Sequence, residues 1–231
     1  MASGENKVQF NLKNVHYAKL TELSPTPTFD TPVTVPGAVS LSLEQQGELT
    51  KFYADGIVYW QSSTNNGYEG NLEMARFPDQ MYQDIWGDTL SATDNVLMEN
   101  ANTQPKSFAL LFQIDGDVTK SLYCLYNCTA TRPNIEGETT NENKEPKTAS
   151  CTVSAVPLPD GNVRARTTAT TTENVITNWF KKVYMPSAAA AAAATANVPA
   201  TAEAPEVGEV AVSAAEPNLQ TENTAPDSMG G

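Results

Sequence analysis

The side chains best suited to bind a transition metal are one histidine, His16, and three cysteines, Cys124, Cys128 and Cys151. Zinc sites draw their cysteine and histidine ligands from closely spaced pairs. The four residues here follow no such spacing, and His16 lies beside Tyr17 in an alternating strand pattern. We therefore predict no metal site and a structural role for His16.

The three cysteines also lack the arrangement of a disulfide framework. Cys124 and Cys128 are four residues apart, so in a strand they share one face with Cα atoms about 13 Å apart. That separation is too large for a disulfide. An odd number of cysteines favours synthesis in a reducing compartment, and we predict three buried apolar thiols.

Two acidic patterns could serve catalysis or ion binding. Glu69 and Glu73 would share one face of a strand, as a carboxylate pair for glycoside chemistry could. The run from Asp115 to Asp117 begins like a calcium loop but lacks its later ligands. We favour solvated or interface acids for the first pattern and a turn for the second.

No nucleophile elbow, phosphate loop or dinucleotide fingerprint is present. The sequence therefore predicts neither an enzyme nor a cofactor, and no catalytic, cofactor-binding or metal-binding residue is assigned. One binding alternative stays open, because four aromatic residues could form a platform for sugars in a carbohydrate-binding β-sandwich: Tyr53, Tyr59, Trp60 and Tyr68.

The charge balance limits the partners. The formal net charge of the 231 residues is −13, of which six negative charges lie in residues 187–231, so −7 remains for residues 1–186. An acidic surface repels phosphate, which argues against tight nucleic-acid binding but is compatible with DNA sliding past. The opening residues do not resemble a secretion signal, and no apolar run is long enough for a membrane span.

The elements that must position these residues are mostly strands. Alternation of apolar and polar residues predicts strands in 8–20, 38–43 and 69–77. A hairpin turn is expected at Asp55-Gly56, and a longer hairpin spans 107–131, whose strand Ser107–Ile114 is apolar enough to be buried on both faces. Another hairpin is predicted from 149–158 to 162–170. The proline-rich residues 21–35 and the charged residues 134–147 are expected to be loops.

Two helices complete the predicted elements. Pro78 and Gly87 would bound the first, with Met81, Tyr82, Ile85 and Trp86 as its apolar stripe. The second would follow a capping box at residues 170–173. After Pro186 the sequence becomes rich in Ala, Pro and Glu, so we predict a β domain over 1–186 and a disordered acidic tail over 187–231.

The order of several segments resembles the major tail proteins of long-tailed, non-contractile phages of Gram-positive bacteria. The resemblance rests on these pieces of residues 1–186: VQFNLKNVHYAKLT, VPGAVSLSLEQQGE, FYADGIVYW, NNGYEGNLEMA, FALLFQIDGD, LYNCTATRP and WFKKVYMP. It implies a mainly β fold, a β-sandwich or partial barrel with a flanking short helix. It also implies a structural virion protein made in the host cytoplasm, which polymerises as stacked hexameric rings into the tail tube.

The same resemblance implies the partners. These are further copies of the chain, a tape measure protein in the lumen, and tail terminator and distal tail proteins at the ends. DNA would pass through the acidic lumen without specific binding. The 21–35 and 134–147 loops would contact other subunits, and a chain shortened after Pro186 would still assemble. The tube of a related contractile injection or secretion system is a further alternative.

Overall fold

The computed structural model describes residues 5–24, 26–139 and 146–186. The predicted acidic tail, 187–231, lies outside these ranges, as does the middle of the predicted 134–147 loop. Within these ranges, thirteen strands and three short helical segments follow in chain order. They are β1 Gln9–Glu22, β2 Thr28–Phe29, β3 Val33–Thr34, β4 Ala38–Gln46, β5 Leu49–Ala54, β6 Ile57–Ser63, β7 Gly67–Met74, α1 Asp79–Met81, η1 Tyr82–Trp86, β8 Thr89–Leu90, β9 Leu97–Met98, β10 Phe108–Gly116, β11 Ser121–Ala130, β12 Ala149–Val156, β13 Arg164–Arg166 and α2 Glu173–Asn178.

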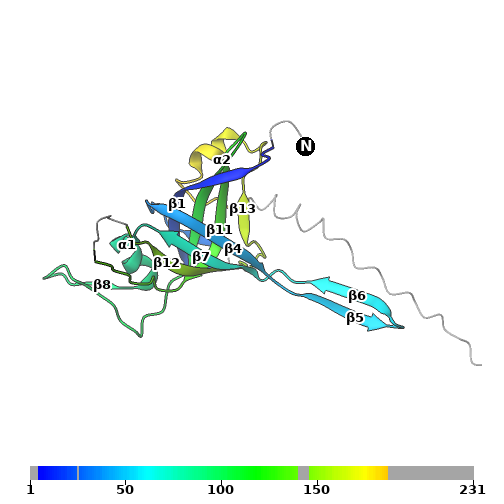
Figure 1. The fold of residues 1–231 in the computed structure, drawn as a ribbon, viewed down its shortest axis with the longest axis horizontal. Helices are drawn as coiled ribbons and strands as arrows, with labels where there is room; N and C mark the ends of the chain where they lie inside the picture. Colours follow the sequence, from blue (N-terminus) through cyan, green and yellow to red (C-terminus); the bar gives the residue numbers. More distant parts are fainter. Residues whose placement is uncertain (1–4, 25, 140–145, 187–231) are drawn as a thin grey trace, which may run out of the picture. The chain divides into compact units, whose positions relative to one another are not determined.

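One antiparallel sheet organises the fold (Figure 1). Its main strand order is β2-β1-β10-β11-β12-β7-β4, with β3 paired to β1 and β13 paired to β11. The long strand β1, next to the short edge strand β2, contacts the opposite edge strand β4, although the two are not paired in the described chain. The sheet therefore curves into a partial barrel, so the expected mainly β fold with a short flanking helix is confirmed.

Both faces of the sheet are covered around the β10–β11 hairpin. Along β10, Phe108, Leu110 and Phe112 face one core cluster, while Ala109 and Leu111 face the other. This two-sided burial is the reason for the uninterrupted apolar run of this strand. The predicted buried hairpin is therefore confirmed.

A β-bulge changes the facing of one cysteine. Between the pairs Phe108–Cys128 and Leu110–Leu125, β11 advances three residues while β10 advances two. The extra residue reverses the side to which the following side chains point. Cys124 consequently lies in one core cluster and Cys128 in the other, and the prediction that they share a face is wrong.

The first helical segment fills the concave side of the sheet. Pro78 precedes α1 in an extended conformation, and Gly87 ends η1, a π-helical turn, with φ 72°. Met81, Ile85 and Trp86 are buried. The Trp86 indole N–H donates to the Ala130 and Thr131 carbonyls at 3.1 and 3.0 Å. The predicted apolar stripe thus fixes this segment on the sheet.

The second helix differs from its prediction. It ends at Asn178, and Thr172 stands at its N-cap without a side-chain hydrogen bond. The predicted capping box does not form, because the N-cap falls at Thr172 and the Thr170 hydroxyl instead lies 3.1 Å from the Thr168 hydroxyl. Trp179 and Val183 are nevertheless buried against the outer face of the sheet.

Two further predictions fail because the segments concerned form backbone pairs with β1 or β11. The 21–35 segment contains β2 and β3, both paired with β1, so it is not simply a loop. β12 and β13 form no hairpin together: β11 pairs with β12 over Asn127–Ala130 and with β13 over Tyr123–Leu125.

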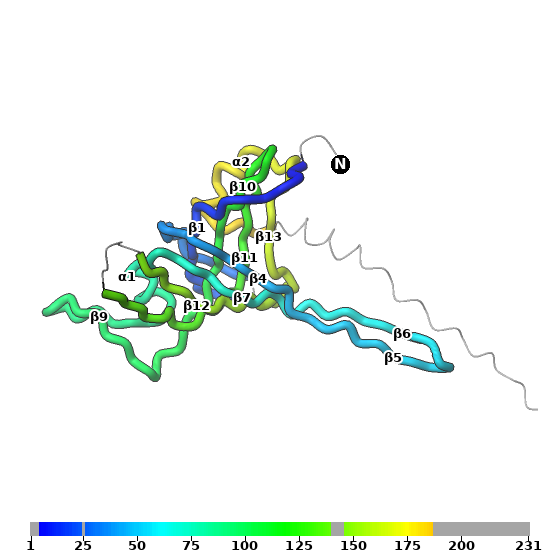
Figure 2. The backbone as a smooth tube through the Cα atoms, in the orientation of Figure 1, coloured from blue at the N-terminus to red at the C-terminus, as the bar shows by residue number. Residues whose placement is uncertain are grey.

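Two small hairpins have strands outside the main sheet. β5 and β6 pair only with each other in the described chain, as do β8 and β9. The β5–β6 hairpin leaves β4 after Gln46 and rejoins the sheet at Gly67 (Figure 2). We call residues 49–63 the arm.

Candidate assembly interface

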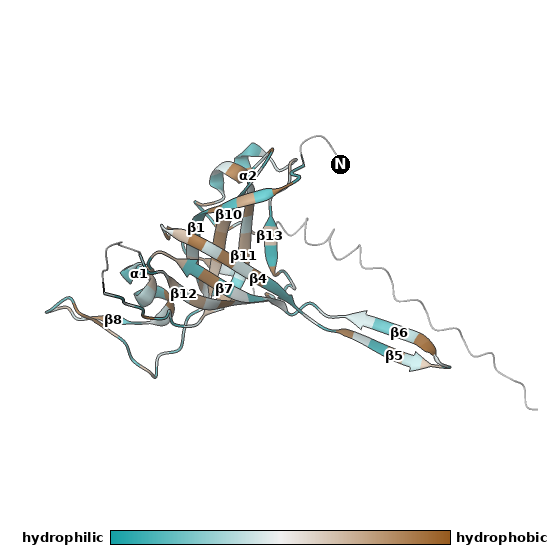
Figure 3. Ribbon diagram, viewed as in Figure 1, coloured by the Kyte–Doolittle hydropathy of each residue, from teal (hydrophilic) through white to brown (hydrophobic). Residues whose placement is uncertain are grey.

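The arm exposes apolar side chains on both of its faces. Phe52 pairs with Trp60 across one face, and Tyr53 pairs with Val58 across the other, because successive strand residues point to opposite sides. Brown apolar segments accordingly mark both β5 and β6 in Figure 3. Seven large apolar residues of the arm are 44% to 70% exposed: Leu49, Phe52, Tyr53, Ile57, Val58, Tyr59 and Trp60.

Such a surface is unusual for a monomer. Contiguous exposed apolar area marks interaction sites, and an isolated two-stranded hairpin is marginally stable in water. Asp55 and Gly56 both have positive φ, 53° and 79°, which fits the tight turn that the Asp-Gly pair predicts. The arm therefore has a defined tip and an apolar stem that lacks a cover within the described chain.

A second surface is polar and acidic. Three paired rows run across β4, β7 and β12, and their side chains point away from the core. The rows are Ser40–Glu73–Ser150, Ser42–Asn71–Thr152 and Glu44–Glu69–Ser154. None of the nine residues is basic, and Glu44 stands directly opposite Glu69, a like-charge pairing that costs stability. We call these nine residues the acidic face.

Glu69 and Glu73, for which the sequence favours solvated or interface acids over a carboxylate pair, lie within this face. Glu73 accepts hydrogen bonds from Thr148 Oγ1 at 2.5 Å and Ser40 Oγ at 2.8 Å. The Thr148 hydroxyl, and then that of Ser40, holds the pKa of the Glu73 carboxyl below its usual value. Glu69 is exposed and shares neither hydrogen-bond partner of Glu73, so no common hydrogen bond couples the two acids.

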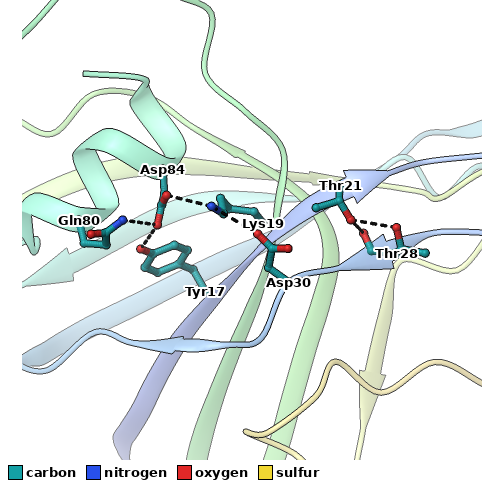
Figure 4. Close-up of polar contacts among 7 residues, drawn as sticks. All are labelled: Tyr17, Lys19, Thr21, Thr28, Asp30, Gln80 and Asp84. Carbon is teal, nitrogen blue, oxygen red and sulfur yellow. Dashed lines mark hydrogen bonds and ion pairs between the residues drawn. The ribbon is translucent and has the colours of Figure 1, made fainter. Parts of the chain in front are cut away.

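A cluster of charged residues joins η1 to the sheet (Figure 4). The Asp84 carboxylate accepts hydrogen bonds from Tyr17 Oη at 2.8 Å, Lys19 Nζ at 3.1 Å and Gln80 Nε2 at 3.1 Å. Lys19 also forms an ion pair with Asp30 at 3.3 Å. No sequence pattern pointed to this cluster, because its members come from β1, the segment after β2, and the helical turns.

The cluster changes the pKa values of its members. Burial alone would raise the pKa of Asp84, but the hydrogen bonds from Tyr17, Gln80 and Lys19 outweigh it and lower that pKa. Burial, followed by the hydrogen bond to Asp84, raises the pKa of Tyr17 far above its usual value. Asp84 therefore stays ionised and Tyr17 stays a neutral donor, an arrangement that positions the helical segment on the sheet.

Arg132 anchors the β8–β9 hairpin through charged contacts of the same kind. Its guanidinium bonds the Asp88 carboxylate at 2.6 Å, the Trp86 carbonyl at 3.0 Å and the Glu99 carboxylate at 3.0 Å. Asp88 and Glu99 flank the β8–β9 hairpin on either side. These contacts hold the β8–β9 hairpin near the end of η1, together with its exposed apolar residues Leu90, Val96 and Met98.

The other residues considered for chemistry have structural roles. The His16 ring stacks on Phe180 with centroids 4.6 Å apart. Asp117 accepts the Lys7 backbone N–H at 2.8 Å, and Asp115 pairs with Lys13 at 2.7 Å. Asp115 and Gly116 belong to β10 and pair with β1, so the turn begins later than predicted, at Asp117. Within the described ranges, no group of three or more His, Cys, Asp or Glu side chains could hold a metal ion.

The cysteines are buried and unpaired thiols. Burial raises the pKa of Cys128 and Cys151 to about 12 and that of Cys124 well above its ordinary value. A thiol that stays protonated is a poor nucleophile. The predicted role as buried apolar thiols is confirmed.

The four aromatic residues of the sugar-platform alternative do not all share one surface. Tyr53 and Trp60 lie on opposite faces of the arm. Tyr68 lies on β7, where the Arg164 guanidinium sits 5.2 Å from its ring centroid. The structure therefore separates the residues that such a platform would need on one surface.

Comparison with known proteins adds little. No protein-family model matches the chain, and no curated protein matches it. Among solved structures, the tube-terminating cap of the anti-feeding prophage is similar over 73% of this chain and 98% of that chain, at 10% identity and a TM-score of 0.39. A similarity this weak carries no argument about fold or role. None of the helices in the described ranges is long and apolar enough to cross a membrane.

Proposed function

We propose that this chain is a structural virion protein that polymerises as stacked rings into a phage tail tube, through which DNA reaches the host. The role needs no catalytic residue, cofactor or metal. The motif order of residues 8–186 suggests the family, and the arm is the observation that carries the proposal. Its partners would be further copies of the chain, with tape measure, terminator and distal tail proteins inside and at the ends of the tube.

The arm supports self-assembly because burying its exposed apolar side chains between copies would be favourable. Burying one exposed side chain of the size of Phe or Ile contributes about 1.5–3 kcal/mol, and seven such residues are exposed here. A protein made in many copies has other copies of itself as its most abundant neighbours. Contacts between copies would cover the arm and order it.

The acidic face supports passage of DNA. Its three glutamates have no basic neighbour within the nine residues, and its remaining side chains are small and neutral, Ser, Thr or Asn. A negative surface repels the phosphate backbone, and short hydroxyl side chains offer it no cation to bind. We assign this face to the lumen of the tube, with the arm directed to other subunits.

Sedimentation of the purified full-length chain over a range of concentrations, followed by negative-stain electron microscopy, tests the proposal. We expect rings or tubes that accumulate as the concentration rises. A monomer that persists at all concentrations would contradict the proposal. Binding of the monomer to glycans would then favour the carbohydrate-binding alternative.

A further inference from the structure

An apolar groove lies between the segment around β2 and the helix α2. Its volume is about 590 Å³. Its apolar lining includes Phe29 from β2, Val175 and Trp179 from the α2 region, and Val183 and Met185 from the segment that follows. Among the described residues that line it, Lys182 alone is charged, and it forms no ion pair within the described chain.

The tip of the arm has matching properties. Residues 53–58 carry Tyr53, Ile57 and Val58 around the Asp55-Gly56 turn, and Asp55 is their single charge. No heavy atom lies within 4 Å of the position that a Gly56 Cβ would occupy, so the turn stands clear of its surroundings. An apolar tip with one negative charge thus faces solvent, as does an apolar groove with one positive charge.

We propose that the tip of the arm of one copy enters the β2–α2 groove of a second copy, with Asp55 pairing with Lys182. The inference rests on the proposed function, since it names the contact through which copies associate. In Figure 1 the tip points away from α2 of the same copy, which favours an occupant from another chain. The charges are complementary, and both surfaces are apolar around them.

The geometry of this contact has a consequence for assembly. The arm and the groove are different surfaces of one chain, so each copy keeps a free arm or a free groove after it has joined one neighbour. Such a head-to-tail contact produces a ring when the rotation closes and a filament when it does not. A reciprocal exchange, with the arm of each copy in the groove of the other, would instead close as a symmetric dimer, which sedimentation distinguishes from larger assemblies.

Charge reversal tests the contact in the full-length chain. Asp55→Lys and Lys182→Asp should each raise the concentration needed for assembly by about tenfold, because each places like charges together. Combining both reversals in one chain should restore assembly to within about threefold of the original. Lys181→Asp is the matched control, since it makes the same charge change on the neighbouring exposed residue, outside the groove lining.

Cross-linking provides a second readout that does not depend on affinity. A chain with Asp55→Cys mixed with a chain with Lys182→Cys should give a disulfide-linked dimer under a mild thiol oxidant. The buried native cysteines should not contribute.

If the wild type assembles but neither reversal affects it and no cross-link forms, the inference is overturned while the proposed function stands. If the wild type never assembles, both are overturned. Mutual rescue of the two reversals supports both.

Discussion

At the scale of single residues, the most consequential side chain is Asp84. One carboxylate accepts hydrogen bonds from a tyrosine and a lysine of β1 and from Gln80 of the helical segment. Its side chain is 13% exposed, so solvent can replace these partners only in part. Charged hydrogen bonds of this kind contribute more than neutral ones, and here they hold η1 against the sheet.

We expect Asp84→Asn to lower the free energy of unfolding by about 2 kcal/mol, because a half-buried lysine and a tyrosine hydroxyl lose their charged acceptor. Urea unfolding followed by tryptophan fluorescence would measure it. Asp79→Asn is the control, since Asp79 pairs with Arg76 while both side chains are largely exposed. It should cost about 0.5 kcal/mol or less, and equal losses would contradict the assignment.

The same carboxylate predicts a pH dependence. The folded-state pKa of Asp84 is lowered, so its stabilising contribution is present above the unfolded pKa of about 4. That contribution is lost as the pH falls through the folded pKa. The difference in urea midpoint between wild type and Asp84→Asn should be full at neutral pH and shrink below about pH 4. A difference that is constant from neutral pH to about pH 3 would count against this account.

At the scale of elements, the arm is the part that the main fold does not explain. The two core clusters of the sheet and the first helical segment are buried within the described chain. The arm pairs with nothing else there and retains apolar groups on both faces. We therefore propose that the arm acts in contacts with other copies of the chain.

The double variant Phe52→Ser with Trp60→Ser should separate folding from assembly. Both side chains are more than half exposed, so the thermal midpoint of the unassembled protein should change little. Sedimentation should show that assembly is lost, because the variant has no apolar cross-strand pair whose burial between copies would stabilise the contact. Val118→Ser, an exposed apolar residue in the β10–β11 turn, should leave assembly unchanged. Retained assembly of the double variant would show that this face of the arm is not buried between copies.

At the scale of the whole molecule, the proposed function makes the charge of the acidic face decide whether an assembled tube would bind DNA. The chain carries −13 overall, and its curved sheet gathers three glutamates on a face without a basic residue. A surface of that kind lets a polyanion pass without holding it.

We expect Glu44→Lys with Glu69→Lys to make assembled protein retain double-stranded DNA in a pull-down at low salt. Retention should disappear as salt is raised, because phosphate contacts release counterions. Glu5→Lys with Glu22→Lys makes the same change in net charge at exposed residues outside the acidic face and should retain no more DNA than wild type. Equal retention by both double variants would contradict the placement of this face in the lumen.

Prediction from the sequence succeeded where local pattern and burial agree. The apolar run of β10, the Asp-Gly turn of the arm and the Pro78-to-Gly87 helical segment each follow from neighbouring residues alone. The failures arise from pairing between distant segments. β13 pairs with β11 and not with β12. Residues 28–34 contain β2 and β3, which pair with β1. The bulge between β10 and β11 places Cys128 in the other core cluster from Cys124.

The sequence by itself determined the mainly β class, the acidic balance and the types of residue available for chemistry, because these depend on composition and short-range periodicity. Only the tertiary structure decided which polar rows align into the acidic face, that Asp84 joins three segments, and that the aromatic residues 53, 60 and 68 lie apart. The register between strands far apart in the chain fixes these neighbours. That register is set by the packing of both cores, which no short stretch of sequence contains.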